Sequence, residues 1–304
     1  MVNYDIIIVG GGPAGLTAAL YARRANKSVL VLEKAAFGGQ ITFSPKVENI
    51  PGHSALSGND FAAQLVDQVM ELGAELEPAE VTGIRLNSDG TKTVITDDGE
   101  YTSKAVIIAS GAAHRRLGLD GEEELIGSGI SFCAVCDGAF YQGRTVGVVG
   151  GGNSALQEAL LLADLAEKVI IVQNLDHLTG EETLKNRVAE KKNIEVITGS
   201  TVAGFIGNGE LKGIQIQNAS GEKREIALDG LFVAIGLAPQ NGAFSDVIDL
   251  DGYGYAASDE SCITKSAGIF VAGDCRQKKV RQVTTACADG ATAALAACEY
   301  CDII

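Results

Sequence analysis

Two stretches of the chain repeat one order of apolar and polar positions. Each begins with a short apolar run, passes through a glycine-rich turn, continues as a helix and ends in a second apolar run. The apolar runs lie at 4–9 and 28–32 in the first stretch, and at 145–149 and 168–172 in the second. Short apolar runs bounded by turns are typical of buried parallel strands. The pattern therefore predicts one strand–helix–strand unit that the chain uses twice.

The end of the chain predicts how the two units are connected. Residues 268–274 form a further apolar run that closes on an aspartate, and residues 285–300 form a helix of small side chains. Both look like the completion of the first unit. We therefore expect an α/β fold of two Rossmann-like domains, each with three layers (ββα), the second inserted into the first. The expected bounds are 1–114 together with 243–304 for the first domain, and 115–242 for the inserted domain.

Other elements are expected between these runs. At 59–72, apolar residues recur on one helical face, and the glycine that follows suits a helix end. Residues 80–104 contain two Asp-Gly turns and predict a small β-meander. Residues 105–109 form another buried strand, and residues 181–191 form a polar helix.

The first glycine-rich turn, Gly10 to Gly15, has the spacing G-x-G-x-x-G. In this motif Gly10 permits the tight turn, Gly12 the approach of a pyrophosphate and Gly15 the packing of helix on strand. The pyrophosphate would lie at the helix N-terminus. Glu33 ends the second strand and can accept hydrogen bonds from an adenosine ribose. A turn without a ligand is the alternative, and the ordered strand, helix, strand and acid argue against it.

Cys133 and Cys136 form a C-x-x-C motif between the two glycine turns. That spacing suits a reversible dithiol and disulfide pair, and a helix start beside it favours a thiolate. Asp137 follows directly and can exchange a proton with a sulfur. The motif alone would also fit half of a zinc site, or two buried cysteines without chemistry. Its place between two dinucleotide-binding turns favours redox chemistry.

Composition narrows the classes of partner. The 304 residues carry a net charge of -15, so a nucleic-acid backbone would be repelled. No apolar run is long enough for a transmembrane helix, and we expect no membrane partner. The N-terminus enters a strand directly, without the charged start or cleavage site of a signal peptide. Seven cysteines without such a signal indicate a reducing compartment, so we expect the protein in the cytoplasm.

Taken in order, these motifs resemble those of the low-molecular-weight thioredoxin reductases, which are FAD-containing pyridine nucleotide–disulfide oxidoreductases. The resemblance covers nearly the whole chain and rests on eight ordered motifs: Gly10–Gly15, Gly38–Gln40, Val47–Gly52, Cys133–Gly138, Gly150–Ala155, Gly230–Gly236, Gly273–Asp274 and Arg281–Gln282. It implies FAD in the first domain, and the redox cysteines, usually with NADPH, in the second. It also implies a homodimer and a domain rotation that carries the cysteines between flavin and thioredoxin.

The resemblance also assigns roles to single residues. Cys136 would face the flavin, Cys133 would attack the disulfide of thioredoxin or of a thioredoxin-like protein, and Asp137 would be the general acid/base. Asp274 would bind the ribityl chain or the pyrophosphate. The residues that would contact FAD lie in the glycine turns, at strand ends and before the last helix: Gly10, Gly12, Pro13, Ala14, Gly15, Glu33, Lys34, Gly39, Gln40, Asn49, Ala109, Gly111, Gly273, Asp274, Arg281, Gln282 and Val283.

The chain departs from the resemblance where NADPH would bind. Members that use NADPH carry a histidine and several arginines after the second strand of the inserted domain, because the 2′-phosphate needs charge-assisted hydrogen bonds. Here that stretch, Val172–Gly180, contains no Arg or Lys. Three interpretations stay open. They are atypical nucleotide binding at the Gly150–Ala155 turn, NADH with Gln173 or Asn174 on the ribose, and a donor other than a nucleotide.

A branch of the family that resembles this chain in lacking those cations takes electrons from reduced ferredoxin. We favour this interpretation, because the loss of charge-assisted hydrogen bonds disfavours NADPH. The acidic net charge opposes it, since ferredoxins are usually acidic as well. A local basic patch would be needed, and ordinary solvated loops would also explain the two candidate clusters, Lys278, Lys279 and Arg281, and Arg115 and Arg116. A flavin-binding redox sensor or regulatory protein is the alternative from another class.

The remaining cysteines and the histidines give weaker signals. Cys298 and Cys301 form a second C-x-x-C and could share a metal cluster with Cys275 and Cys287. We favour packing within a helix of small residues instead. The three histidines are scattered without zinc spacing, so we expect no metal site.

Overall fold

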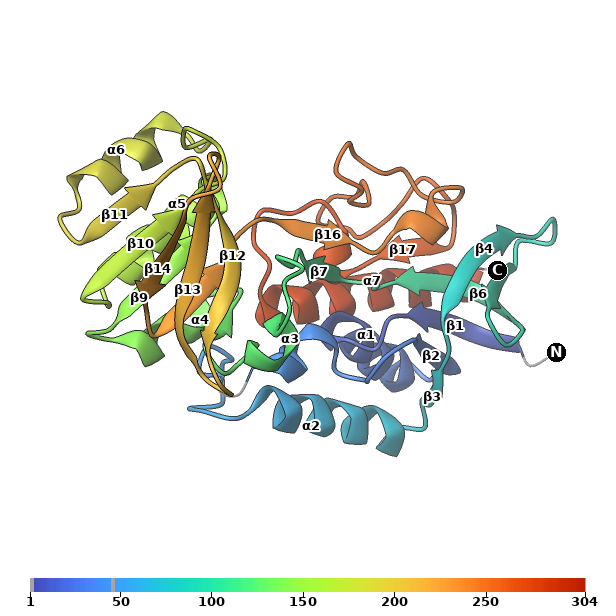
Figure 1. Ribbon diagram of the computed structural model, residues 1–304. Coiled ribbons are helices and arrows are strands. Elements are labelled where there is room, and N and C mark those ends of the chain that lie inside the picture. Colours follow the sequence, from blue (N-terminus) through green and yellow to red (C-terminus); the bar gives the residue numbers. More distant parts are fainter. Residues whose placement is uncertain (1–2, 45–46, 304) are drawn as a thin grey trace. The chain divides into compact units, whose positions relative to one another are not determined.

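The computed structural model describes residues 3–44 and 47–303, which divide into two compact units (Figure 1). The first unit runs to Ala113 and resumes at Ala238, and the second unit is His114–Leu237. The sequence predicts the domain boundaries at 114/115 and 242/243. In the structure the second boundary comes earlier, between residues 237 and 238. At this boundary the strand Leu237–Pro239 (β16) pairs with the strand Ala112–His114 (β7). Residues 1, 2, 45, 46 and 304, which the expected first domain includes, lie outside the described part.

A parallel sheet forms the centre of the first unit. Its strands follow the order β3-β2-β1-β6, and β17 pairs with the second half of β6. Strands β5 and β4 extend the same sheet in antiparallel order. The bounds are β1 Asn3–Val9, β2 Val29–Glu33, β3 Glu75–Pro78, β4 Val81–Leu86, β5 Lys92–Thr96, β6 Glu100–Ile108 and β17 Ile269–Val271.

Strand β6 joins two parts that the pattern predicts as separate. Residues 100–103 pair with β5 in the expected meander, and residues 106–108 pair with both β1 and β17 in the parallel sheet. The expected buried strand at 105–109 is thus the second half of one nine-residue strand. Its pattern changes midway because only the second half is buried on both faces.

Helices cover one face of this sheet, namely α1 (Pro13–Arg24), α2 (Gly58–Glu71) and α7 (Val283–Ile303). Ile6 and Ile8 of β1 belong to this helical core, whereas Ile7 belongs to the core on the opposite face. Helices α1 and α7 lie very close, since a Cβ on Gly290 would be 2.1 Å from the Ala14 carbonyl oxygen. The helices expected at 59–72 and 285–300 are confirmed with shifted ends. The short 3-10 turns of this unit are η1 Gly39–Phe43, η3 Gly242–Phe244 and η4 Gly273–Cys275.

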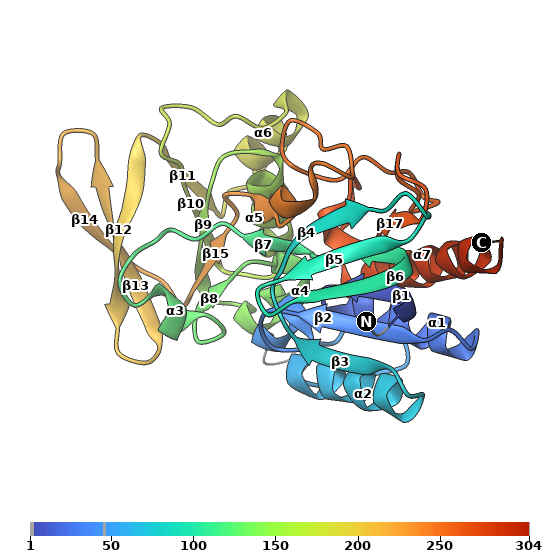
Figure 2. The same ribbon diagram turned by 90° about the vertical axis from the view of Figure 1, so that its right-hand side faces the viewer.

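The second unit is built of three layers (Figure 2). Its parallel sheet follows the order β11-β10-β9-β15-β8, with helices α4, α5 and α6 on one face and the antiparallel sheet β12-β13-β14 on the other. The strands are β8 Ile130–Ser131, β9 Thr145–Val149, β10 Lys168–Val172, β11 Ile194–Ile197, β12 Ser200–Gly207, β13 Leu211–Asn218, β14 Lys223–Ala227 and β15 Gly230–Val233. The helices are α3 Glu122–Leu125, α4 Ala134–Asp137, η2 Gly138–Tyr141, α5 Asn153–Ala163 and α6 Glu182–Glu190.

The predicted strands at 145–149 and 168–172 coincide with β9 and β10. The α/β fold of two Rossmann-like, three-layer domains is therefore confirmed, with the second inserted into the first. Across residues 3–44 and 47–303, no helix combines the length and apolar surface that a membrane crossing requires.

Candidate active site and cofactor-binding residues

The first glycine turn lies between β1 and α1. Gly10 has φ +110°, and a Cβ there would lie 2.2 Å from the Ala109 carbonyl oxygen, so only glycine fits. A Cβ on Gly15 would lie 1.9 Å from the Gly10 carbonyl oxygen. A Cβ on Gly12 would lie 3.9 Å from its nearest neighbour, the Gly39 Cα, so the space around Gly12 is open. Helix α1 begins at Pro13, and no side chain in the described part of the protein caps it. The first N–H groups of α1 are therefore open to an anionic ligand.

Glu33 at the end of β2 lies beside this turn. Its Oε2 accepts the Gly11 N–H at 2.7 Å, and its Oε1 accepts the Ala35 N–H at 2.9 Å. Each carboxylate oxygen keeps a further lone pair for a ribose hydroxyl. Lys34 pairs with Glu80 at 3.3 Å. Glu33 lines a small pocket together with Gly10, Lys34, Glu80 and Ser110. Ser110 lies in the sequence between Ala109 and Gly111, two residues that were predicted to contact FAD.

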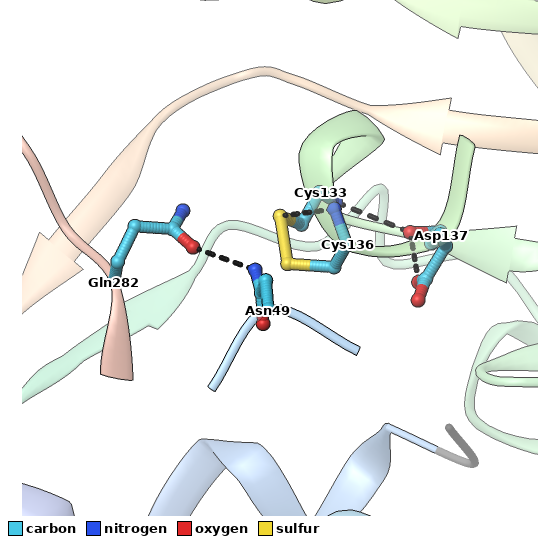
Figure 3. The surroundings of a disulfide bond; sticks show 6 residues. Asn49, Cys133, Cys136, Asp137 and Gln282 are labelled. Atoms are coloured by element: carbon cyan, nitrogen blue, oxygen red, sulfur yellow. Dashed lines mark hydrogen bonds between the residues drawn. A yellow bond between two sulfur atoms is a disulfide. The ribbon is translucent and has the colours of Figure 1, made fainter. Parts of the chain in front are cut away.

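Two loops place further predicted residues near the turn. A Cβ on Gly39 would lie 3.1 Å from the Gly12 Cα, so η1 lies against the turn, and Gln40 is exposed there. Asn49 donates from Nδ2 to Oε1 of Gln282 at 3.1 Å (Figure 3). Val283 begins α7 and packs on the same small apolar core as the η1 side chain of Ile41. The first unit thus brings these segments together.

The loop after β17 carries Gly273 and Asp274. A Cβ on Gly273, which has φ +78°, would lie 2.8 Å from the Ala14 Cβ, so the loop touches the first turn of α1. Oδ1 of Asp274 is buried and has no hydrogen-bond partner among the described residues. Burial raises the pKa of Asp274, while Lys278 and Arg281 oppose that rise. A buried acceptor of this kind calls for a donor from outside the chain, such as a ligand hydroxyl.

Asp289 of α7 holds this loop in place. Its carboxylate accepts the Gly273 N–H at 3.0 Å, Arg276 Nη2 and Nε at 2.7 and 2.8 Å, and Lys278 Nζ at 2.9 Å. Burial would raise the pKa of Asp289, but the hydrogen bonds from Arg276 and Lys278 outweigh it and lower that pKa. The pairing is a buried, fully bonded ion network, which fixes the backbone of residues 273–278.

This network changes the interpretation of the first basic cluster. The side chain of Lys278 is only 5% exposed, so it offers no charge to a partner. The Arg281 guanidinium lies 4.2 Å from the Tyr255 ring centroid and donates to the Asp274 carbonyl oxygen. Lys279 alone is exposed. The expectation of a compact surface cluster, or of an ordinary solvated loop, is therefore wrong for Lys278, whose side chain is buried, whereas Arg281 is half-buried and bound to the first unit.

The residues of the first unit fit FAD. Its glycine turn leaves room at Gly12 beside open helical N–H groups, which suits a pyrophosphate. Glu33 offers acceptors in a pocket next to Gly10. Asp274 presents a buried acceptor without a hydrogen-bond partner in the described chain, beside the first turn of α1, with Lys278 Nζ 3.9 Å away. These three features match the anionic and hydroxyl groups that a flavin dinucleotide carries.

Cys133 and Cys136 form a disulfide in the second unit (Figure 3). Cys133 is the N-cap of α4, and its Sγ accepts the Cys136 N–H at 3.2 Å. Its carbonyl oxygen accepts the Asp137 N–H at 3.0 Å. The Cys133 sulfur therefore accepts a backbone N–H at the start of α4, a contact that stabilises a thiolate. Within the described ranges, no cluster of His, Cys, Asp and Glu could hold a metal ion.

Asp137 ends α4 and bonds back to β8. Its Oδ2 accepts the Ser131 hydroxyl at 2.6 Å, and the Ser131 Oγ accepts the Cys133 N–H at 3.1 Å. Oδ1 of Asp137 is buried and without a partner in the described chain. Burial raises the pKa of Asp137, and the bond from Ser131 opposes that rise. The raised pKa makes this carboxyl a better proton donor than an exposed aspartate would be.

Phe132, which precedes Cys133, lies in an aromatic and cationic stack. Its ring centroid is 4.8 Å from that of His114, and the Arg116 guanidinium lies 5.3 Å from it. Burial and Arg116 lower the pKa of His114 to about 4, so the imidazole is neutral at physiological pH. Arg116 also forms an ion pair with Glu123 at 3.2 Å. One of the two arginines of the second basic cluster is therefore paired within the second unit. The stack fixes the chain entering the disulfide.

The second glycine turn keeps its shape but has different surroundings. The nearest atom to a Cβ on Gly152 would be Thr179 Oγ1 at 3.8 Å, and none of the described side chains caps α5. Gln173 is buried, and its Nε2 donates to the His177 carbonyl oxygen at 3.3 Å. A Cβ on Gly151 would lie 2.6 Å from the Gln173 amide group. Gln173 is therefore buried beside the turn, and its Nε2 is bound to the chain.

The five remaining cysteines are free. Cys298 and Cys301 belong to the core between α7 and the first sheet, which confirms the packing interpretation. Burial raises the pKa of Cys262 to about 12 and that of Cys301 to about 11, so these thiols stay protonated.

Sequence reasoning missed three polar residues that the structure brings out. Ser131 bonds Asp137, and Asp289 binds two cations, as described above. Glu158 of α5 has a buried Oε2 without a partner in the described chain, and burial raises its pKa to about 7. A signal existed for Asp289, which is a lone carboxylate in a run of small residues. Nothing in the sequence separates Ser131 or Glu158 from ordinary surface residues.

Comparisons with known proteins match both units. The profile of the pyridine nucleotide-disulphide oxidoreductase family matches residues 4–290. A thioredoxin reductase of Listeria monocytogenes is 40% identical over 299 residues, covering 98% of this chain and 93% of that protein. A 34.2 kDa protein in the rubredoxin operon of Clostridium pasteurianum is 41% identical over 298 residues, covering 97% and 96%. The crystal structure of thioredoxin reductase from Streptococcus pyogenes superposes with a TM-score of 0.94 at 38% identity, covering 99% of each chain.

The matched ranges include both glycine turns and the disulfide. The chain therefore belongs to the pyridine nucleotide-disulphide oxidoreductase family, in its low-molecular-weight thioredoxin reductase branch, and its cofactor is FAD.

Proposed function

We propose that this protein is an FAD-dependent thioredoxin reductase that reduces thioredoxin or a thioredoxin-like protein through Cys133 and Cys136, with reduced ferredoxin as its electron donor. The named reductases among its relatives support the enzyme class. They give no support to a redox sensor without turnover. The observation that carries the role of the cysteines is their disulfide at the start of α4, with Asp137 at the end of the same helix.

In the dithiol form, Cys133 is the attacking thiolate. Its sulfur accepts the Cys136 N–H, which favours the charged form. The Cys133 sulfur bonds to one target sulfur while the target disulfide breaks and its other sulfur leaves as a thiolate. Cys136 then displaces the first target sulfur and closes the Cys133–Cys136 disulfide. The target gains an electron pair and two protons, and the enzyme dithiol loses them.

Asp137 supplies and takes up the protons of this exchange. Its burial favours the protonated carboxyl, and the Ser131 bond keeps the ionised form accessible. FAD, when bound, supplies the electron pair that opens the enzyme disulfide. Gly10 to Gly15 would hold its pyrophosphate, Glu33 its adenosine ribose and Asp274 its ribityl or pyrophosphate oxygens. The remaining contacts proposed for FAD are Lys34, Gly39, Gln40, Asn49, Ala109, Gly111, Gly273, Arg281, Gln282 and Val283.

The donor is inferred from the surroundings of the second glycine turn. Residues 173–180 contain no Arg or Lys, and Gln173 is turned inward. Asp176 does not replace it, since its carboxylate is paired with the adjacent His177 at 2.6 Å. A 2′-phosphate would meet no cation in this stretch, which supports a donor other than NADPH. The uncapped start of α5 favours the second candidate, a reductase that binds NAD(P)H atypically.

An anaerobic titration tests the donor. Flavin absorbance of the purified holoenzyme is followed while NADPH, NADH or reduced ferredoxin is added separately. We expect bleaching by reduced ferredoxin and none by either nucleotide at micromolar concentration. A matched variant, Asn174→Arg with Thr179→Arg, places cations on two exposed positions beside the turn and should gain bleaching by NADPH. Rapid bleaching of the unchanged protein by NADPH or NADH would overturn the ferredoxin assignment and leave the reductase assignment intact.

We also propose that the enzyme is a homodimer in the cytoplasm, as the family resemblance implies. Light scattering of the holoenzyme at micromolar concentration gives the mass directly, and a mass of one chain would contradict the dimer.

A further inference from the structure

The Ser131 hydroxyl connects the two ends of the cysteine segment. Ser131 ends β8 and is only 5% exposed. Its Oγ lies 3.1 Å from the Cys133 amide nitrogen and 2.6 Å from Asp137 Oδ2. The contact to Asp137 is thus a short side-chain bond across six positions, from a strand end to the end of α4.

The direction of these bonds follows from the donors present. A backbone N–H can only donate, so the Ser131 oxygen accepts from Cys133. The single hydroxyl hydrogen is then left for Asp137 Oδ2, which accepts it. If Oδ2 were protonated, its proton and the Ser131 hydroxyl hydrogen would both lie between Oδ2 and the Ser131 oxygen, which are only 2.6 Å apart. Oδ1, which is buried without a partner in the described chain, is the oxygen free to carry a proton.

We propose that Ser131 is a positioning residue for Asp137, holding the carboxyl at Oδ2 and directing its exchangeable proton to Oδ1. This inference rests on the proposed role of Asp137 as general acid/base. In the transfer, the O–H bond at Oδ1 breaks, an S–H bond forms on the departing thiolate, and the carboxylate that remains keeps its bond from Ser131. The serine thus stabilises the form of Asp137 that has just given up its proton.

The groups around Asp137 are few. Burial and the charge of Asp137 both raise the pKa of the Tyr141 hydroxyl on η2. On α5, which packs against α4, the single ionisable residue is Glu158. The strand β8 contributes Ser131, and α4 contributes the two disulfide sulfurs. Loss of the serine hydroxyl would therefore act on Asp137 through this one hydrogen bond, and it would disfavour the ionised carboxylate.

The experiment measures the carboxyl of Asp137 directly. The 13C carboxyl shift of Asp137 is titrated with pH in the oxidised holoenzyme and in three variants, Ser131→Ala, Ser131→Thr and Ser131→Val. In Ser131→Ala, we expect the pKa of Asp137 to rise by about one unit or more, since a hydrogen bond to a charged group is lost. In Ser131→Thr, which keeps the oxygen, it should stay near its original value. The threonine and valine variants have the same shape, so their difference isolates the hydroxyl even if the alanine variant folds poorly.

A second readout follows catalysis. With chemically prereduced enzyme and thioredoxin, the alkaline limb of the single-turnover pH profile should move upward in Ser131→Val by the same amount as the carboxyl pKa. An unchanged Asp137 titration in the alanine and valine variants, or a threonine variant that behaves like valine, would overturn the inference. Failure of the wild-type protein to reduce thioredoxin would instead refute the proposed function. The carboxyl titration would still report the Ser131 bond in that case, so the two failures are distinguishable.

Discussion

Cys133 and Cys136 lie three positions apart on one short segment, yet their sulfurs meet different surroundings. The Cys133 sulfur caps α4 and accepts an N–H, whereas Cys136 lies inside the helix and donates that N–H from its own backbone. The C-x-x-C spacing cannot assign these roles, because it treats both sulfurs alike. The roles were implied by family resemblance, and the geometry at α4 gives them a physical reason.

Replacing Cys133 with serine tests this difference. Cys133→Ser removes the proposed attacking thiolate, so thioredoxin reduction should fall at least about a thousandfold, since a hydroxyl is a far weaker nucleophile than a thiolate. FAD absorbance should be unchanged, because Cys133 belongs to the second unit. Cys298→Ala, in the core of the first unit, is the matched control and should keep its activity. Retained turnover by Cys133→Ser would contradict the assignment.

At the scale of elements, the periodic pattern predicted most strands and helices, and missed what depends on tertiary contacts. The strands predicted at 145–149 and 168–172 have the same bounds in the structure, because a parallel strand that is buried on both faces is an uninterrupted apolar run in the sequence. The continuity of β6 was missed, because its first half is polar and half-exposed. The glycine turns were predictable from spacing, but the orientation of Gln173 and the burial of Lys278 were not. Both depend on how a loop folds back on its neighbours, which places Gln173 against His177 and Lys278 against Asp289.

The close packing of α1 on α7 predicts the effect of one substitution. In an exposed helix, Gly→Ala stabilises by about 1 kcal/mol. At Gly290 the added methyl would lie 2.1 Å from the Ala14 carbonyl oxygen, so Gly290→Ala should instead destabilise by about 1–3 kcal/mol. The measurement is the thermal midpoint of the holoenzyme, followed by flavin fluorescence on release. Gly99→Ala, where a Cβ meets open space, serves as control and should leave the midpoint nearly unchanged. A higher thermal midpoint for Gly290→Ala would contradict this prediction, because it would show that α1 and α7 can move apart without loss of stability.

At the scale of the whole molecule, charge opposes the proposed donor. The chain carries a net charge of -15, and the described cluster around residues 278–281 leaves Lys279 as its exposed cation. An acidic ferredoxin would therefore approach against a long-range repulsion.

This repulsion sets a salt dependence with a definite sign. Raising the ionic strength from about 10 mM to about 150 mM shortens the Debye length to roughly 8 Å and screens distant charges. The second-order rate constant for flavin reduction by ferredoxin should therefore rise severalfold over that range. Stopped-flow absorbance at a series of salt concentrations gives the slope. A rate that falls with salt would mean that a local basic patch, rather than the net charge, governs the encounter.

The paired connections β7 and β16 have a consequence for the history of the chain. Within the second unit, the Arg115 N–H donates to the Gly236 carbonyl oxygen at 3.0 Å, so its two ends are neighbours. Within the first unit, the Gln240 N–H donates to the Gly111 carbonyl oxygen at 3.2 Å, so the gap that it leaves is equally narrow. A domain whose two ends are neighbours can be inserted, removed or exchanged without moving the backbone of the domain that contains it. An exchange of the inserted domain during evolution therefore requires no rearrangement of the host backbone at the junction.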